Sequence, residues 1–228
     1  MLIFRPNIIP SETKTEEVHK RIFEWGNENL RDFPWRKTSD PYKILIAEIM
    51  LHRTRASQVE SIYDSFLHKY PDLNSICEAG IKKIMSDLAE LGLQWRTKLL
   101  HNMACSIIKN NYGIIPSSKK ELMKFPGIGN YISSAIICFA FEKPEPILDT
   151  NTVRVIGRVF SLKITDSSRR SKKFERIMLK MVKLGECKLF SLSLIDFAHF
   201  ICKPKDPLCK QCLINELCCY YQGLVKHE

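Results

Sequence analysis

The sequence has no apolar run long enough to cross a membrane. A spanning helix needs about 20 consecutive apolar residues, whereas the longest apolar stretch, residues 132–141, reaches about half that length and includes two serines. The first residues also lack the basic segment and sustained apolar core of a secretory signal. We therefore expect an intracellular protein of the cytoplasm or nucleoid.

Internal repeats, low-complexity tracts and strand-like runs of alternating β-branched residues are absent as well. Apolar residues instead recur every three to four positions, as on one face of a helix, and prolines or glycines separate these segments. The chain is therefore predicted to be all-α. The expected helices cover residues 14–31, 40–55, 57–70, 80–90, 95–111, 118–124, 130–141, 150–160, 171–184 and 190–201.

Charge and composition describe a folded, basic protein. Its 228 residues are 45% hydrophobic and 26% charged, which excludes disordered and collagen-like chains and fits one large or two small domains. Lys and Arg number 35 and Asp and Glu 25, so the net charge is +10. This excess favours a polyanionic partner such as nucleic acid, although charge alone leaves an anionic membrane surface open.

Two glycines stand between helical segments in Phe125-Pro126-Gly127-Ile128-Gly129. The proline ends the first segment, and glycine permits positive φ angles and a close approach of the backbone to another molecule. The second segment then begins with unpaired amides, so this hairpin could present several N–H donors to one phosphate oxygen. An ordinary turn between two helices is the alternative.

Five of the nine cysteines crowd the C-terminal end of the sequence, whereas Cys77, Cys105, Cys138 and Cys187 are scattered singly. An odd number of cysteines without a secretion signal makes a disulfide framework unexpected, because a reducing cytosol keeps thiols free. Four thiolates within seventeen residues instead indicate a metal centre, and Cys219 is then a spare thiol. Spacing alone does not separate an iron–sulfur cluster from zinc, although zinc sites usually use two short paired gaps. The four predicted ligands are Cys202, Cys209, Cys212 and Cys218.

Glu48 is the polar exception in an apolar segment, residues 44–51. A carboxyl group there should be buried, and burial disfavours its charged form, so its pKa should rise toward values useful to a proton donor. The alternative is a glutamate paired with a basic neighbour such as Arg36 or Arg53.

Asp149 stands where a proline-bearing loop meets a predicted helix, so we expect it to cap that helix. Hydrogen bonds from the helix amides and the positive helix end favour an ionised carboxylate. Most such aspartates only cap a helix. An ionised aspartate near a protonatable glutamate nevertheless matches the pair of carboxyl groups that cleaves glycosidic bonds.

Together these residues resemble the helix-hairpin-helix DNA glycosylase superfamily with a C-terminal iron–sulfur loop. The resemblance runs from about Phe33 to Cys218. It includes, in the order of that family, Pro34-Trp35-Arg36 with Asp40-Pro41-Tyr42, then Ala47-Glu48-Ile49-Met50-Leu51, the hairpin, Asp149 and the four clustered cysteines.

The resemblance implies an all-α fold with two lobes. A six-helix barrel at residues 36–141 would carry the helix-hairpin-helix motif at 118–141, and residues 1–35 with 142–228 would form the second lobe around the cluster loop at 202–218. It also implies a [4Fe-4S] cluster on the four cysteines, because their spacing matches the cluster loop of endonuclease III and adenine glycosylase relatives. The DNA would bind across the cleft, with the target nucleotide flipped out of the stack.

By this resemblance Asp149 corresponds to the catalytic aspartate, and Glu48 aligns with the glutamate of the adenine and mismatch branches. Bifunctional members carry a Schiff-base lysine two residues after the second glycine, where this chain has Tyr131. A neutral phenol cannot form that imine. The resemblance therefore implies a monofunctional glycosylase that uses water as nucleophile, with weak or absent lyase activity.

Two branches of the family fit the sequence. Adenine glycosylases usually carry an extra C-terminal domain, and we expect none here because the sequence runs only ten residues beyond Cys218. The length, the tyrosine after the hairpin and the segment Leu51-His52-Arg53-Thr54-Arg55 look similar to the thymine–guanine mismatch glycosylases. Arg53 is then the candidate wedge that fills the gap left by the flipped base, with a phosphate contact as its alternative role.

Two tryptophans lie close to these motifs. Trp95 with Arg96 could present an aromatic face or a cation to a flipped base. We expect instead that Trp95 packs in the barrel and that Trp35 is likewise structural, so neither belongs to the predicted catalytic set.

The resulting hypothesis is a DNA glycosylase of base excision repair that removes thymine or uracil mispaired with guanine, with Glu48 and Asp149 as catalytic residues. Its partner is double-stranded DNA with a mismatched or damaged base, and we expect a monomer with no membrane partner. The alternatives are an adenine glycosylase acting opposite guanine or 8-oxoguanine, and a non-catalytic iron–sulfur DNA-binding protein. The predicted DNA contacts are Gly127, Gly129, Arg53 and Tyr131.

Overall fold

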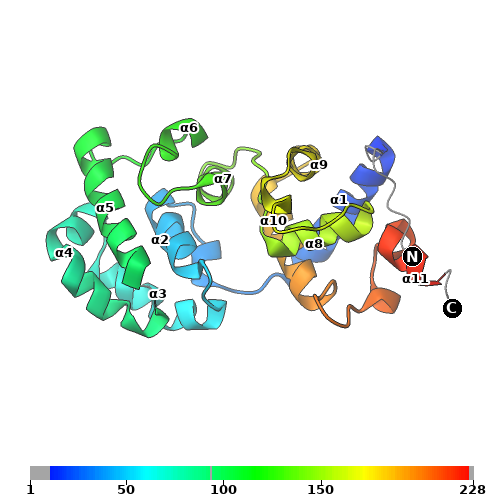
Figure 1. The fold of residues 1–228 in the computed structure, drawn as a ribbon, viewed down its shortest axis with the longest axis horizontal. Coiled ribbons are helices and arrows are strands. Elements are labelled where there is room, and N and C mark those ends of the chain that lie inside the picture. The colour runs from blue at the N-terminus through cyan, green and yellow to red at the C-terminus, as the bar shows by residue number, and fades with distance from the viewer. Residues whose placement is uncertain (1–10, 93, 226–228) are drawn as a thin grey trace. The chain divides into compact units, whose positions relative to one another are not determined.

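The computed structural model describes residues 11–92 and 94–225, and these ranges contain helices and no strand. The predicted all-α class is therefore confirmed. None of the described helices combines the length and apolar character needed to cross a membrane. The described residues form two compact units, Asp32–Lys143 and a second unit of residues up to Arg31 with those from Pro144 onward (Figure 1). That these units are separate domains with the boundaries given above stays a prediction.

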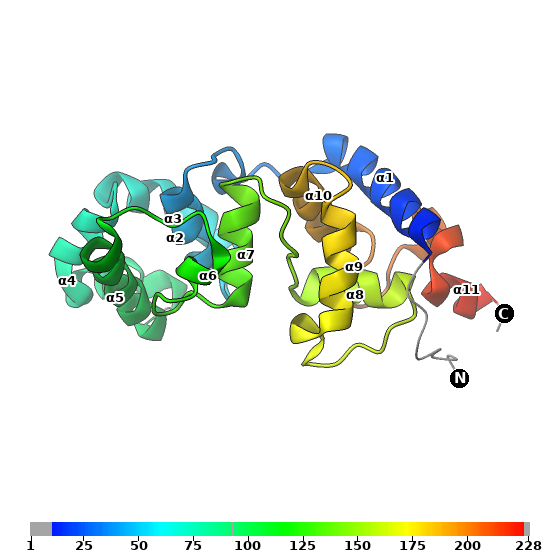
Figure 2. The same ribbon diagram turned by 90° about the horizontal axis from the view of Figure 1, so that it is seen from above.

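The unit Asp32–Lys143 is built around one buried helix, α2. Seven apolar or aromatic side chains of α2 are buried, and the helix packs against α3 and α7. Asp40 caps α2 by accepting a hydrogen bond from Tyr42 N at 2.8 Å, and Pro41 suits the first helical position. Beside this core, α4 lies along α5 (Figure 2). The helices of this unit are α2 (Pro41–Leu51), α3 (Ala56–Lys69), α4 (Leu73–Asp87), α5 (Gln94–Asn111), α6 (Lys119–Leu122) and α7 (Asn130–Phe139), with 3₁₀ turns at Pro34–Arg36 and Ala89–Leu91.

The second unit joins the start of the sequence to its end. A Cβ atom at Gly26 of α1 would lie 1.7 Å from Ser193 Oγ of α10, so only glycine allows these two helices to approach so closely. The carboxylate of Asp196, which is fully buried, accepts hydrogen bonds from the backbone and guanidinium of Arg31 at 2.6–2.8 Å. The helices of this unit are α1 (Glu12–Asn29), α8 (Thr150–Val159), α9 (Lys172–Val182), α10 (Cys187–Phe200) and α11 (Cys219–Val225), with 3₁₀ turns at Ser168–Arg170, Cys209–Gln211 and Asn215–Leu217.

Two helices differ most from the sequence-based prediction, and α2 also ends at Leu51 rather than at residue 55. α4 begins at Leu73 rather than at residue 80, because Asp72 caps it by accepting a hydrogen bond from Ser75 N at 2.8 Å. Gly80, with φ of 74°, interrupts the helical geometry inside α4, so the periodic pattern was clear only after it. α11 lies outside every predicted helix, since its seven residues are too few to establish a period of 3.6.

One pair of cysteines contradicts the expectation of free thiols. Cys77 of α4 and Cys105 of α5 form a disulfide with their Cα atoms 5.2 Å apart. The two residues are 28 positions apart in the sequence, and the packing of α4 along α5 brings them together. Spacing along the chain could not show this contact.

Candidate functional site

The hairpin between α6 and α7 presents backbone amides at an open surface. Gly127 has φ of 82°, a left-handed conformation that favours glycine, and Ile128 N donates to Phe125 O at 3.2 Å to close the turn. Gly129 caps α7 with φ of −89°, so of the two glycines only Gly127 needs the positive φ that the sequence suggested. Among the described residues, the amides of Gly127 and Gly129 donate no hydrogen bond, and a Cβ atom at Gly129 would meet nothing within 4 Å. An anion could therefore approach this turn closely.

A pocket opens beside the hairpin within the same unit. It spans about 390 Å³ when the open solvent at its mouth is included, and Pro126 and Gly127 form one of its walls. His52 lines it from the end of α2, and Trp95 and Arg96 line it from the first turn of α5. The structure thus brings together three segments that the sequence places apart.

Trp95 occupies an environment opposite to the one expected, and its neighbour Arg96 is buried. Trp95 is 53% exposed, so the prediction that it packs in the barrel is wrong, whereas Arg96 is only 7% exposed. The helical period of α5 could have predicted this difference in exposure, because Arg96, Leu100 and Met103 share one buried face and Trp95 lies off it. Trp35, in contrast, is buried against Phe33 and Tyr63, as predicted.

The Arg96 guanidinium is buried with part of its hydrogen-bonding capacity unused. Its Nη1 donates to Ile49 O at 3.4 Å, and its Cζ atom lies 5.2 Å from the centre of the Trp95 ring. Its Nε has no hydrogen-bond partner among the described residues. Burial lowers the pKa of Arg96, and the charge of nearby Arg53 lowers it further. An unpaired donor at the pocket wall suits an acceptor such as a carbonyl oxygen.

Glu48 is buried, as predicted, and only 6% of its surface is exposed. It lies in α2 beside Ile49, which lines the pocket and whose carbonyl oxygen accepts the Arg96 hydrogen bond. The buried carboxyl group is therefore close in sequence to the wall of this pocket.

Arg53 lies in the turn between α2 and α3 and is exposed. Its φ of 64° is left-handed, which is rare for a residue other than glycine and costs about 1 kcal/mol. The neighbouring His52 ring packs edge-on against Trp95 at the pocket wall, with ring centres 6.1 Å apart. The strained turn thus holds a cationic side chain next to the pocket.

Tyr131 is the second residue of α7 and is half-buried. It follows Gly129 by two positions, and no lysine occurs among the residues of α7. Lys124, the nearest lysine in the sequence, pairs with Glu121 at 2.5 Å on the other side of the turn.

Asp149 belongs to the other unit and caps α8, as predicted. Its Oδ1 accepts hydrogen bonds from the backbone N–H of Asn151 at 2.9 Å and of Thr152 at 2.7 Å. Its Oδ2 accepts from Asn151 Nδ2 at 2.8 Å, while Asp149 N donates to Thr152 Oγ1. These bonds fix the half-buried carboxylate in one orientation at the start of α8.

The four predicted metal ligands line one mostly apolar pocket in the same unit as Asp149. Cys219, predicted to be a spare thiol, is not among the lining residues and accepts a hydrogen bond from Lys14 Nζ at 3.4 Å. Arg158 donates to Cys202 Sγ at 3.3 Å and to the carbonyl oxygens of Lys203 and Pro204. The lining cysteines are Cys202, Cys209, Cys212 and Cys218.

Burial raises the pKa of the Cys212 thiol to about 11, and the neighbouring thiols contribute. Burial likewise raises the pKa values of Cys209 and Cys218. Within the described part of the chain, no three of the four sulfur atoms lie within 4.8 Å of one another.

Comparisons with known proteins agree with this geometry. The chain is 38% identical to the thymine/uracil-DNA glycosylase of Methanothermobacter thermautotrophicus over 202 residues, which cover 88% of this chain and 91% of that protein. It is 35% identical to the thymine-DNA glycosylase of Aeropyrum pernix, with 92% and 96% of the two chains covered. The solved structure of a thermostable thymine-DNA glycosylase matches with a TM-score of 0.87 at 36% identity, over 92% of this chain and 98% of that one. The family described as HhH-GPD superfamily base excision DNA repair protein matches residues 46–183, and the chain belongs to this family.

Proposed function

We propose that the protein is a monofunctional DNA glycosylase that hydrolyses the N-glycosidic bond of thymine or uracil mispaired with guanine. The observation that carries this proposal is the similarity, along nearly the whole chain, to a thymine/uracil-DNA glycosylase at 38% identity. The protein would act as a monomer on double-stranded DNA in base excision repair.

Glu48 and Asp149 would divide the chemistry between them. The buried Glu48 would handle protons, either donating one to the departing base or activating water. The Asp149 carboxylate, held by three hydrogen bonds at the start of α8, would stabilise positive charge on the sugar as the bond breaks. Tyr131 offers no amine, so water would be the nucleophile and strand cleavage would need a separate step.

The pocket beside the hairpin would hold the flipped base. Arg96 Nε, buried without a partner among the described residues, could donate to a carbonyl oxygen of the base. Thymine and uracil each carry two carbonyl oxygens and adenine carries none, so this donor favours a pyrimidine. Arg53, exposed in its strained turn, would fill the gap left in the duplex.

The remaining predicted site residues would bind the DNA backbone or the cofactor. The open amides of Gly127 and Gly129 would receive a phosphate, with Tyr131 at the same helix start. The four cysteines that share one pocket would hold a [4Fe-4S] cluster, which would stabilise the loop between α10 and α11. Lys203, Lys205 and Lys210 of that loop would add positive charge for the DNA.

A panel of duplexes tests the proposal. The purified protein would be incubated with DNA that holds T·G, U·G, A·G, A opposite 8-oxoguanine, or thymine glycol, and strand breaks compared with and without alkali. Breaks at T·G and U·G that need alkali are expected. Cleavage at adenine would indicate an adenine glycosylase instead, and breaks without alkali would contradict the inference from Tyr131.

The Asp149→Asn variant separates catalysis from binding. It keeps the size of the side chain but removes its charge, so we expect duplex affinity close to that of the unmodified protein and little base release. If the unmodified protein releases no base from any substrate while both proteins bind duplex equally, the chain is a DNA-binding protein without glycosylase activity.

A further inference from the structure

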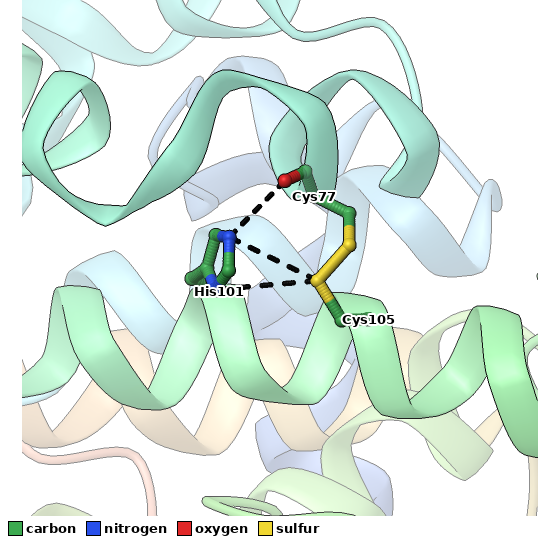
Figure 3. Close-up of side chains that lie close together, drawn as sticks. All are labelled: Cys77, His101 and Cys105. Atoms are coloured by element: carbon green, nitrogen blue, oxygen red, sulfur yellow. Dashed lines mark hydrogen bonds between the residues drawn. A yellow bond between two sulfur atoms is a disulfide. The ribbon is translucent and has the colours of Figure 1, made fainter.

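Three side chains of the kinds that ligate metals lie together in the unit Asp32–Lys143 and are not among the residues assigned to excision. His101 and Cys105 are four residues apart on α5, so they share one face of the helix, and Cys77 faces them from α4 (Figure 3). One sulfur or nitrogen atom from each of the three side chains lies within 4.8 Å of the others. All three residues are half-buried, so a small ion or reductant can reach them.

The hydrogen bond of His101 prepares its ring for a metal. His101 Nε2 lies 3.1 Å from Cys77 O, and a carbonyl oxygen can only accept, so Nε2 carries the proton. The lone pair is therefore on Nδ1, which lies 4.0 Å from Cys105 Sγ. A histidine that donates its second ring N–H to a carbonyl is the usual arrangement at metal sites, because that bond fixes both tautomer and ring orientation.

The spacing of the donor atoms is close to that of a zinc site. Tetrahedral zinc with Zn–S near 2.3 Å and Zn–N near 2.0 Å places sulfur and nitrogen about 3.5 Å apart. His101 Nδ1 lies 4.0 Å from Cys105 Sγ, so a small side-chain adjustment meets this value. Once the disulfide is reduced, the two sulfurs can separate by rotation about χ1 of each cysteine.

We propose that Cys77, His101 and Cys105 form a redox-dependent zinc site. In the oxidised state the two sulfurs form the observed disulfide. A small dithiol transfers two electrons and two protons to it, which breaks the S–S bond, gives two thiols and leaves the reductant as a disulfide. Zn²⁺ then displaces both thiol protons and binds two thiolates and His101 Nδ1, with water as the fourth ligand. Either state ties α4 to α5.

Metal uptake by the full-length protein tests this site without measuring base excision. The protein would be reduced with a dithiol, transferred into a phosphine reductant and titrated with Co²⁺, whose thiolate charge-transfer absorption reports sulfur ligands. His101→Gln keeps both cysteines and removes one ligand, and Cys77→Ser removes one sulfur. His68→Gln, which changes an exposed histidine of α3, is the matched control. Iron content measured in parallel would account for any metal held by the other cysteines.

The unmodified protein and His68→Gln should bind about one equivalent of Co²⁺ more than His101→Gln and Cys77→Ser, and Zn²⁺ should displace it. The oxidised protein should lack this equivalent. Equal uptake by all four reduced proteins, or a disulfide that dithiols do not reduce, would overturn the proposal and leave the Cys77–Cys105 bond as a cross-link alone. Circular dichroism of each variant would show that the helices remain folded.

Discussion

The buried carboxyl group of Glu48 is the side chain on which the proposed proton transfer depends. Glu48→Gln keeps the volume of the side chain but cannot exchange a proton, so excision of thymine from a T·G duplex should slow by about 100-fold or more. Single-turnover rates with enzyme in excess would measure this effect separately from product release, and duplex affinity should change little.

The exposed Glu60 of α3 gives the matched control for Glu48. Glu60→Gln removes the same charge from the same unit without touching the pocket, so it should retain the full rate of excision. An equal loss of rate in both variants would show that net charge, rather than proton transfer by Glu48, is responsible.

The Arg53→Gly variant tests the proposed wedge, because it removes the side chain and also relieves the backbone strain at this position. Glycine tolerates the φ of 64°, and the relieved strain roughly offsets the added freedom of the unfolded chain, so Arg53→Gly should change the free energy of unfolding by less than about 1 kcal/mol. A wedge is needed only where a base must leave a stacked duplex. Excision of uracil from a U·G duplex should therefore fall much more than excision from single-stranded DNA, and equal losses on both substrates would instead indicate a phosphate contact.

Single residues could be predicted from the sequence where the cause is local. The burial of Glu48 follows from apolar neighbours on every side of its segment, and the cap at Asp149 follows from a polar residue placed directly before a periodic run. The unpaired Nε of Arg96 could not be predicted, because it depends on how α5 packs against α2. The same limit applies to the disulfide between Cys77 and Cys105.

At the scale of elements, the hairpin between α6 and α7 makes different demands on its two glycines. Gly129 has a backbone conformation that any residue can adopt, and a methyl group there meets no protein atom within 4 Å. Gly129→Ala should therefore fold normally while its methyl group obstructs a phosphate. We expect affinity to fall about tenfold, which corresponds to the roughly 1.4 kcal/mol of one charge-assisted hydrogen bond.

The loss of duplex affinity in Gly129→Ala should be equal for matched and mismatched duplexes, because phosphate contacts carry no sequence information. Titrations at one fixed salt concentration would measure it. Gly127→Ala is less informative, because its φ of 82° and a Cβ atom only 3.3 Å from Leu99 Cβ would disturb the turn itself. Unchanged affinity of the folded Gly129→Ala variant would mean that the hairpin is an ordinary helix connection.

Most helices could be placed from the sequence because their apolar faces and capping residues are local signals. α4 shows where this fails, since the positive φ of Gly80 breaks the period and hides the first half of the helix. The short α11 shows the second limit, because a helix of two turns is defined by what it packs against rather than by its own pattern. The hairpin was found from its glycines, but only the structure shows which one requires a left-handed conformation.

At the scale of the whole molecule, two compact units divide the predicted site residues between them. Glu48, Arg53 and the hairpin belong to Asp32–Lys143, whereas Asp149 and the four clustered cysteines belong to the other unit. The sequence predicted each group of residues, but which segments of chain join to form a unit depends on contacts between distant parts, such as Arg31 with Asp196. The three tryptophans are also divided, with Trp25 in one unit and the other two in Asp32–Lys143.

This division allows the stabilising role of the proposed cluster to be measured in one unit at a time. Trp25 packs edge-on against Phe197 of α10, and Phe197 O accepts a hydrogen bond from Cys202 N at the start of the cysteine loop. Loss of the cluster by oxidation and chelation should therefore lower the unfolding temperature reported by Trp25 in a Trp35→Phe/Trp95→Phe background. A decrease of only about 2 kcal/mol in the free energy of unfolding would lower the unfolding temperature of a unit of roughly 100 residues by about 10 °C. A Trp25→Phe protein reports the other unit, whose transition should stay within about 2 °C when the two units unfold separately. Equal shifts at both reporters would mean that the two units unfold as one, and no shift at Trp25 would contradict a stabilising role of the cluster.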